Sequence, residues 1–96
     1  MIHLHVDFDL DPALEQQMLT AFRETFSPAI RKQPGFVDVQ LLRESAGVNY
    51  RLLIAFESQE QRQQWVESPL HQEVWPAIER TLRGSKYAAR LYDVLK

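Results

Sequence analysis

The residues of this chain that could do chemistry are aromatic side chains and a histidine at helical spacings. His71 and Trp75 stand four residues apart, and so do Phe22 and Phe26, so each pair shares one face of a helix. Flat aromatic walls suit a flat apolar ligand, and an imidazole with an ordinary pKa of about 6.5 can move a proton near neutrality. His71 is therefore the candidate catalytic residue of an apolar site, as general base or hydrogen-bond donor. The candidate substrate-binding walls are Trp65, Trp75, Phe22, Phe26 and Tyr50.

Each of these residues also has a purely structural interpretation. Phe22 and Phe26 fit the core stripe of an amphipathic helix. His71 falls in the first turn of a predicted helix, where a side chain can simply face water. Two indoles in a small domain need partners for their N–H groups, yet they can still be ordinary packing. The sequence leaves both interpretations open.

Composition limits the classes of protein to which the chain can belong. Its 96 residues, 45% hydrophobic and 25% charged, predict one globular domain over residues 1–96. The 11 basic and 13 acidic residues form no basic stripe, so we expect no nucleic-acid partner. The lack of cysteine excludes disulfides and thiolate chemistry and fits a reducing, cytoplasmic location. The longest apolar run is Leu52 to Phe56 and no signal peptide is visible, so we expect no membrane association.

Hydrophobic periodicity predicts four strands and two main helical regions. Strict alternation from Ile2 to Phe8 indicates a strand with one buried face. Strands are expected over residues 2–8, 36–43, 49–57 and 86–95, with Val37, Val39 and Leu41 on one face of the second. Helices are expected over residues 12–32, from the Ser58 cap to Glu67, and from the Ser68–Pro69 pair to Leu82. The Ser27–Pro28 pair predicts a kink or a restart within the first helix.

The order of these elements, βαββαβ with the second helix broken, is that of a ferredoxin-like α+β domain. We predict a four-stranded antiparallel sheet in the order 4-1-3-2, with helices on one face only. The other face mixes polar and apolar side chains, so it is either solvated or covered by another sheet. We expect a homodimer through this face, with His3, His5, Asp38, Gln40, Leu42, Arg51, Leu53, Arg90 and Tyr92 at the interface.

A metal at this face is the weaker alternative for the two histidines. His3 and His5 project from the same side of a strand, as two ligands of one ion would. Only Asp7 or Asp38 could supply a third ligand nearby. We therefore predict no metal site and expect His3 and His5 to form hydrogen bonds at the interface.

A succession of motifs along nearly the whole chain resembles a known family. Pro34-Gly35-Phe36 leads into VDVQLLR, and NYRLLIAFES ends at the capping Ser58. Trp65, then Ser68-Pro69-Leu70-His71, then Trp75-Pro76-Ala77-Ile78-Glu79 follow. In their order and spacing these motifs resemble the antibiotic biosynthesis monooxygenase family.

The resemblance implies a dimeric α+β barrel, with a pocket in each subunit between the helices and the covered sheet face. Enzymes of this family oxidise phenolic or quinol-type substrates with molecular oxygen, and they use neither metal nor flavin. We therefore expect a cofactor-independent monooxygenase acting on a small phenol, quinol or polyketide-type aromatic. The alternative is a non-catalytic module on the same fold that binds a small ligand or serves a stress response.

Haem degradation, the activity of a separate branch of the family, is the weakest hypothesis. That branch uses an Asn on the first strand, a Trp, and an axial His on the last helix. Trp65 stands at a matching place, but the only asparagine is Asn49. His71 lies earlier than the axial ligand, where Trp75 and Pro76 stand instead.

Overall fold

The sheet of the computed structural model has four antiparallel strands, β1 (Ile2–Asp9), β2 (Phe36–Arg43), β3 (Asn49–Phe56) and β4 (Ala88–Asp93). The structure describes residues 1–45 and 47–95. The strand order is β2-β3-β1-β4, which is the predicted order 4-1-3-2 read from the opposite edge. β1 therefore pairs with β3 on one side and with β4 on the other.

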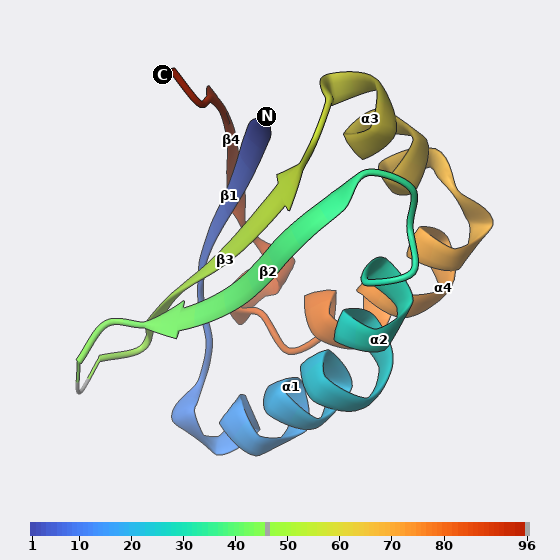
Figure 1. Ribbon diagram of the computed structural model, residues 1–96. Helices are drawn as coiled ribbons and strands as arrows, with labels where there is room; N and C mark the ends of the chain where they lie inside the picture. Colours follow the sequence, from blue (N-terminus) through green and yellow to red (C-terminus); the bar gives the residue numbers. More distant parts are fainter. Residues whose placement is uncertain (46, 96) are drawn as a thin grey trace.

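The helices all lie on one side of the sheet, as Figure 1 shows. Between β1 and β2 run η1 (Pro12–Leu14), α1 (Glu15–Ala21), η2 (Phe22–Phe26) and α2 (Ser27–Ile30). Between β3 and β4 run α3 (Gln59–Glu67), α4 (Pro69–Glu79) and the short turn η3 (Arg83–Ser85). This arrangement confirms the predicted ferredoxin-like α+β fold. Within the described part of the chain, no helix combines the length and the apolar character needed to cross a membrane.

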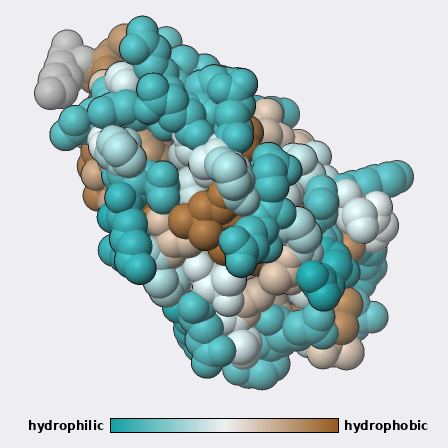
Figure 2. All heavy atoms as spheres, turned by 90° about the vertical axis from the view of Figure 1, so that its right-hand side faces the viewer, coloured by the Kyte–Doolittle hydropathy of each residue, from teal (hydrophilic) through white to brown (hydrophobic). Residues whose placement is uncertain are grey.

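The core lies between the helices and the sheet. Seen from the helical side the surface is mostly hydrophilic, with a small hydrophobic area near the middle of the view (Figure 2). The helices turn their apolar side chains inward, and the sheet meets them with the alternating residues of β1 and β3. Nearly fully buried members of this core are Met18, Phe26, Ile30, Trp65 and Ile78 from the helices and Val6, Leu52, Ile54 and Phe56 from the sheet.

The first helical segment changes its winding before Pro28. The Asp11 carboxylate caps its start by accepting a hydrogen bond from the Ala13 N–H (2.9 Å). Proline donates no backbone hydrogen bond, and its ring crowds the carbonyl one turn earlier. The chain widens into the π-type turn η2 immediately before the Ser27–Pro28 pair and ends its helix at Ile30. The predicted disturbance is therefore present, as a local widening that leaves the segment continuous.

The C-terminal boundaries differ from the prediction. Helix α4 ends at Glu79, three residues before the predicted Leu82. Thr81 Oγ1 donates to the Ile78 carbonyl (2.6 Å), which satisfies a terminal acceptor, and Leu82 then pairs with Leu10 in a β-bridge. The last strand spans Ala88–Asp93, because these are the residues that pair with β1.

The prediction that Val37 shares a face with Val39 and Leu41 is wrong. Phe36 pairs with Phe56 and Asp38 with Ala55, so Val37 is the extra residue of a β-bulge. Val37 is exposed, whereas Val39 is buried in the core. The bulge instead lets Phe36 pack edge-on against Phe56 on the helical side (6.2 Å between ring centroids).

Candidate functional site

A cavity of about 420 Å³ lies between the helices and the covered face of the sheet. Its floor comes from β1, β3 and β4, and its walls come from η2, α3, α4 and the segment before β4. This is the place that the family resemblance implied for a pocket. The lining residues are Leu4, Val6, Phe26, Leu52, Ile54, Arg62, Trp65, Val66, His71, Gln72, Trp75, Glu79, Tyr87 and Ala89.

The structure brings most of the predicted aromatic residues together at this cavity. The Phe26 ring contacts both indoles edge-on, with centroids 5.9 Å from Trp65 and 6.1 Å from Trp75. Phe22 lies behind Phe26, stacked at 6.2 Å, and does not line the cavity. Tyr87, in the segment before β4, packs edge-on against Trp75 (5.4 Å) and forms part of the wall. The widened η2 turn thus delivers one phenyl ring that joins the two indoles.

Ser68 fixes the positions of Trp65 and His71 relative to each other. Its hydroxyl donates to the Trp65 carbonyl (2.7 Å) at the end of α3 and accepts from the His71 N–H (3.1 Å) at the start of α4. One side chain therefore caps both helices at the corner between them. As a result the imidazole lies edge-on to the Trp65 indole at 5.1 Å and stacks on Trp75 at 6.3 Å.

His71 lies in the cavity wall rather than in open solvent. Its side chain is only partly exposed, and its Nδ1 is buried without a hydrogen-bond partner among the described residues. Burial lowers the pKa of His71 below its ordinary value of 6.5, and the charge of Glu79, which lines the same cavity, opposes this shift. This shift favours the neutral imidazole at pH 7.

Arg62 is a residue of this cavity that the sequence analysis missed. It lies in the run QEQRQQ, which offers no sign of burial, yet only 9% of its surface is exposed. Arg62, Trp65 and Val66 lie three and four residues apart, so one face of α3 carries all of them to the cavity. Its Nε donates to Gln59 Oε1 (2.8 Å) and its Nη2 to Gln63 Oε1 (2.7 Å).

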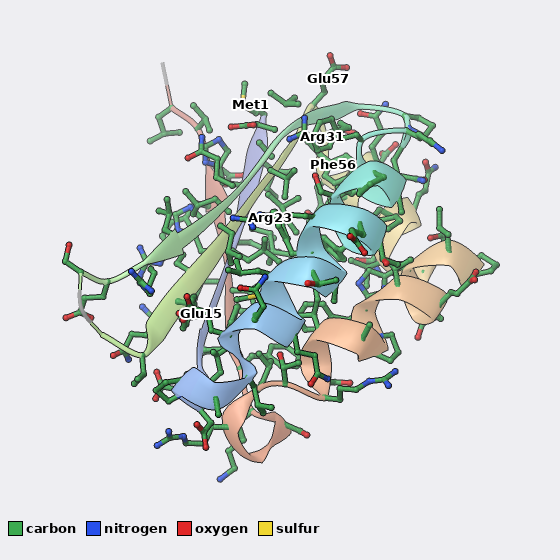
Figure 3. All side chains as sticks on the ribbon, turned by 90° about the horizontal axis from the view of Figure 1, so that it is seen from below. Met1, Glu15, Arg23, Arg31, Phe56 and Glu57 are labelled. Atoms are coloured by element: carbon green, nitrogen blue, oxygen red, sulfur yellow. The ribbon has the colours of Figure 1, made fainter. Side chains whose placement is uncertain are left out.

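Tyr50 lies apart from the other predicted wall residues. It is buried against Phe8, with parallel rings at 5.7 Å, and its hydroxyl donates to Glu15. Arg43 also donates to Glu15 (3.0 and 3.1 Å), and Figure 3 shows Glu15 between α1 and the sheet. Burial and the Glu15 carboxylate raise the pKa of Tyr50, while the hydrogen bond from Tyr50 lowers that of Glu15. This cluster ties the first helix to the β2–β3 hairpin.

The predicted interface residues do share the uncovered face of the sheet. The His5 ring lies 4.5 Å from Tyr92, and His5 pairs with Arg90 across the strands. Arg51 forms an ion pair with Asp7 (2.6 Å), and Gln40 donates to Asp38 (2.7 Å). Leu42 and Tyr92 are exposed on this face, Leu53 is half-buried, and His3 lies 6.0 Å from His5. His5 Nδ1 is buried without a partner in the described residues.

Two further features bear on ligands. A larger, more open hollow of about 770 Å³ lies near the ends of β1 and β3, and Tyr50, Tyr87 and several charged side chains line it. Over residues 1–45 and 47–95, no group of three or more His, Cys, Asp or Glu side chains is placed to hold a metal ion.

Comparisons with known proteins identify a family from the sequence and support the fold from solved structures. The sequence profile described as antibiotic biosynthesis monooxygenase matches residues 1–76. No curated protein matches the chain. Among solved structures, SnoaB from Streptomyces nogalater, described as a cofactor-independent oxygenase, is 20% identical with a TM-score of 0.82, over 99% of this chain and 93% of that one. Rv0793 from Mycobacterium tuberculosis is 16% identical with a TM-score of 0.81, over 99% and 95% of the two chains. A conserved protein from Methanosarcina mazei Go1 is 15% identical with a TM-score of 0.83, over 95% and 89%.

Proposed function

The chain belongs to the antibiotic biosynthesis monooxygenase family, and from this premise we propose that it is a monooxygenase that oxidises a small phenol-, quinol- or polyketide-type aromatic with O2. The reaction would take place in the cavity between the helices and the sheet, without metal or flavin. The observation that carries the proposal is the placement of the His71 imidazole between two indoles, at the wall of a cavity lined mainly by aromatic and aliphatic side chains. SnoaB, described as a cofactor-independent oxygenase, shares the fold and supports the same reaction class.

The chemistry asks the protein mainly for a dry cavity and a base. Trp65, Trp75 and Phe26 would hold the flat substrate, with Phe22 supporting Phe26 from behind. His71 would take the proton of the substrate hydroxyl, because its lowered pKa keeps the imidazole neutral at pH 7. The resulting anion gives up an electron to O2 more easily than the neutral substrate does. For a ring methylene as the reacting group, the balance is CH2 + O2 → C=O + H2O, and both electron pairs come from the substrate.

We also propose that the protein acts as a homodimer through the uncovered sheet face. Leu42 and Tyr92 are exposed there beside the half-buried Leu53, which is unfavourable in an isolated subunit. The buried, unpartnered His5 Nδ1 is a polar atom that a facing sheet could satisfy. A second copy of the chain carries a sheet face of the same size and residues, as a two-fold interface requires.

Oxygen uptake with a panel of anthrones and quinols tests the proposed activity. We expect turnover of at least one compound, and a loss of about a hundredfold or more in kcat/KM for His71→Gln, since a positioned base contributes roughly 10²- to 10⁴-fold. Glu73→Gln, an exposed change on the same helix, is the matched control and should leave kcat/KM unchanged. Ligand binding at the cavity without oxygen uptake would favour the non-catalytic binding module instead. Full activity of His71→Gln would remove His71 from the reaction.

A further inference from the structure

Arg62 is a buried guanidinium without a counter-charge. Arg43 and Arg51 are exposed, and each has a carboxylate partner at 3.0 Å or less. Arg62 is the most buried arginine, and within residues 1–45 and 47–95 it forms no ion pair. A cation removed from water is costly unless an anion or several acceptors compensate it. The imbalance lies at the wall of the cavity, where a ligand can correct it.

The geometry of the guanidinium leaves donors for that ligand. An arginine has five N–H donors, and the amide oxygens of Gln59 and Gln63 take one each. Both amides are neutral, so they orient the fork without cancelling its charge. Trp75 lines the same cavity and is partly exposed, so its ring offers a face to the aromatic part of a ligand whose acidic group reaches Arg62.

The charges around the cavity are separated. Glu79 also lines it, but it is not paired with Arg62, and its charge acts on His71. The cavity therefore has a cationic group on α3 and a carboxylate at the end of α4. An anionic group of a ligand is attracted to the α3 side and repelled from the α4 side.

We propose that Arg62 binds an anionic oxygen of the ligand, so that the cavity selects acidic aromatic molecules. The anionic oxygen is either a carboxylate on the ring or an ionised ring hydroxyl. The inference rests on the proposed function only for the location of the ligand, and it requires no turnover.

Calorimetric titration with 2-naphthoate and its neutral isostere 2-naphthamide tests the charge selection without any oxidation. At pH 7.5 the wild-type protein should bind 2-naphthoate about 10- to 100-fold more tightly than 2-naphthamide, as a charge-assisted pair predicts. Arg62→Gln should reduce this ratio to near one, and Arg62→Lys should keep part of it, because lysine keeps the charge but loses the fork. Arg23→Gln, the same change at an exposed residue outside the cavity, should keep the full ratio.

A titration with 2-naphthol below and above the ionisation of its hydroxyl distinguishes the two sources of the anion. Affinity that rises as the hydroxyl ionises, in wild type but not in Arg62→Gln, assigns the site to a phenolate. A preference for 2-naphthoate without that rise assigns it to a carboxylate. Equal wild-type affinity for 2-naphthoate, 2-naphthamide and ionised naphthol would overturn the proposal, even if Arg62→Gln fails to fold. A folded Arg62→Gln that keeps the full ratio would also overturn it. Oxygen uptake is not measured, so the proposed oxygenation can fail while this inference holds.

Discussion

Replacing Trp65 and Trp75 by alanine, one at a time, should separate core packing from ligand binding, two roles that the sequence does not distinguish. Trp65 is 2% exposed and packs against Phe26 and His71, so it belongs to the core as well as to the cavity. Trp75 is partly exposed and lies between Phe26, His71 and Tyr87 along the cavity wall. We expect Trp65→Ala to act mainly on stability and Trp75→Ala mainly on ligand binding.

The burial of each ring sets the size of the effect. Truncation of a fully buried Trp removes about 3–5 kcal/mol from the free energy of unfolding. A domain of this length has roughly 5–15 kcal/mol in total, so Trp65→Ala should fold with little reserve. Trp75 already borders an open cavity, so its loss leaves no closed void, and we expect a cost of about 1–2 kcal/mol. With about 4–8 °C per kcal/mol, the melting temperature should fall by roughly 12–40 °C in Trp65→Ala and by roughly 4–16 °C in Trp75→Ala.

Urea unfolding followed by far-UV circular dichroism measures both variants without relying on indole fluorescence. All proteins should be compared at one protomer concentration, because association shifts the apparent stability. Calorimetric affinity for 2-naphthoate, measured on the folded variants, gives the second readout. Equal losses of stability in Trp65→Ala and Trp75→Ala would refute the reasoning, since the described burial of the two rings would then not govern their contributions.

Two further predictions concern the histidines and the open sheet face. Because burial lowers the pKa of His71, the native state binds fewer protons than the unfolded chain below pH 6.5, so stability is complete above that pH and falls as the pH drops below it. His71→Asn should flatten this dependence of stability on pH, by at most about 1.4 kcal/mol per pH unit. The lowered pKa of His5 acts with the same sign and should leave a residual slope. An unchanged slope of stability against pH between pH 5 and 7 would contradict the burial argument. Leu42→Lys should convert the proposed dimer to a monomer in sedimentation equilibrium. Ala13→Lys, an exposed change on the first helical segment, should leave the dimer intact. A dimer that survives Leu42→Lys would exclude this face as the interface.

The fold was predictable because its signals are local and periodic. The alternation of apolar and polar residues in β1 identifies a strand, and the capping residues Ser58 and Ser68 mark the starts of two helices. Each of these signals lies within a few residues of the element that it predicts. The β-bulge at Val37 was not predictable, because an extra residue in one strand depends on the register with its partner. The early end of α4 likewise depends on the pairing of Leu82 with Leu10, which is distant from Leu82 in the sequence.

The aromatic part of the site was predictable for the same reason. Helical spacing alone placed His71 and Trp75, and Phe22 and Phe26, on shared faces. The structure groups His71, Trp75 and Phe26 with Trp65 at the cavity, and Phe22 stacks behind Phe26. Residue type was the only basis for grouping Tyr50 with them. The strand that carries Tyr50 begins near Glu15, so the Tyr50 hydroxyl donates to Glu15 instead of lying at the cavity.

Arg62 shows why the charged part of the site could not be read from the sequence. A cation in a glutamine-rich helix is typical of a solvated face, and the weak amphipathic pattern of α3 gives no other sign. Its burial appears only in the fold, where the corner at Ser68 joins α3 to α4 and residues of both helices line the cavity. The same corner also sets the distance between Trp65 and His71. Because the Ser68 hydroxyl joins the end of α3 to the start of α4, a change at Ser68 should disturb the positions of Trp65 and His71 together.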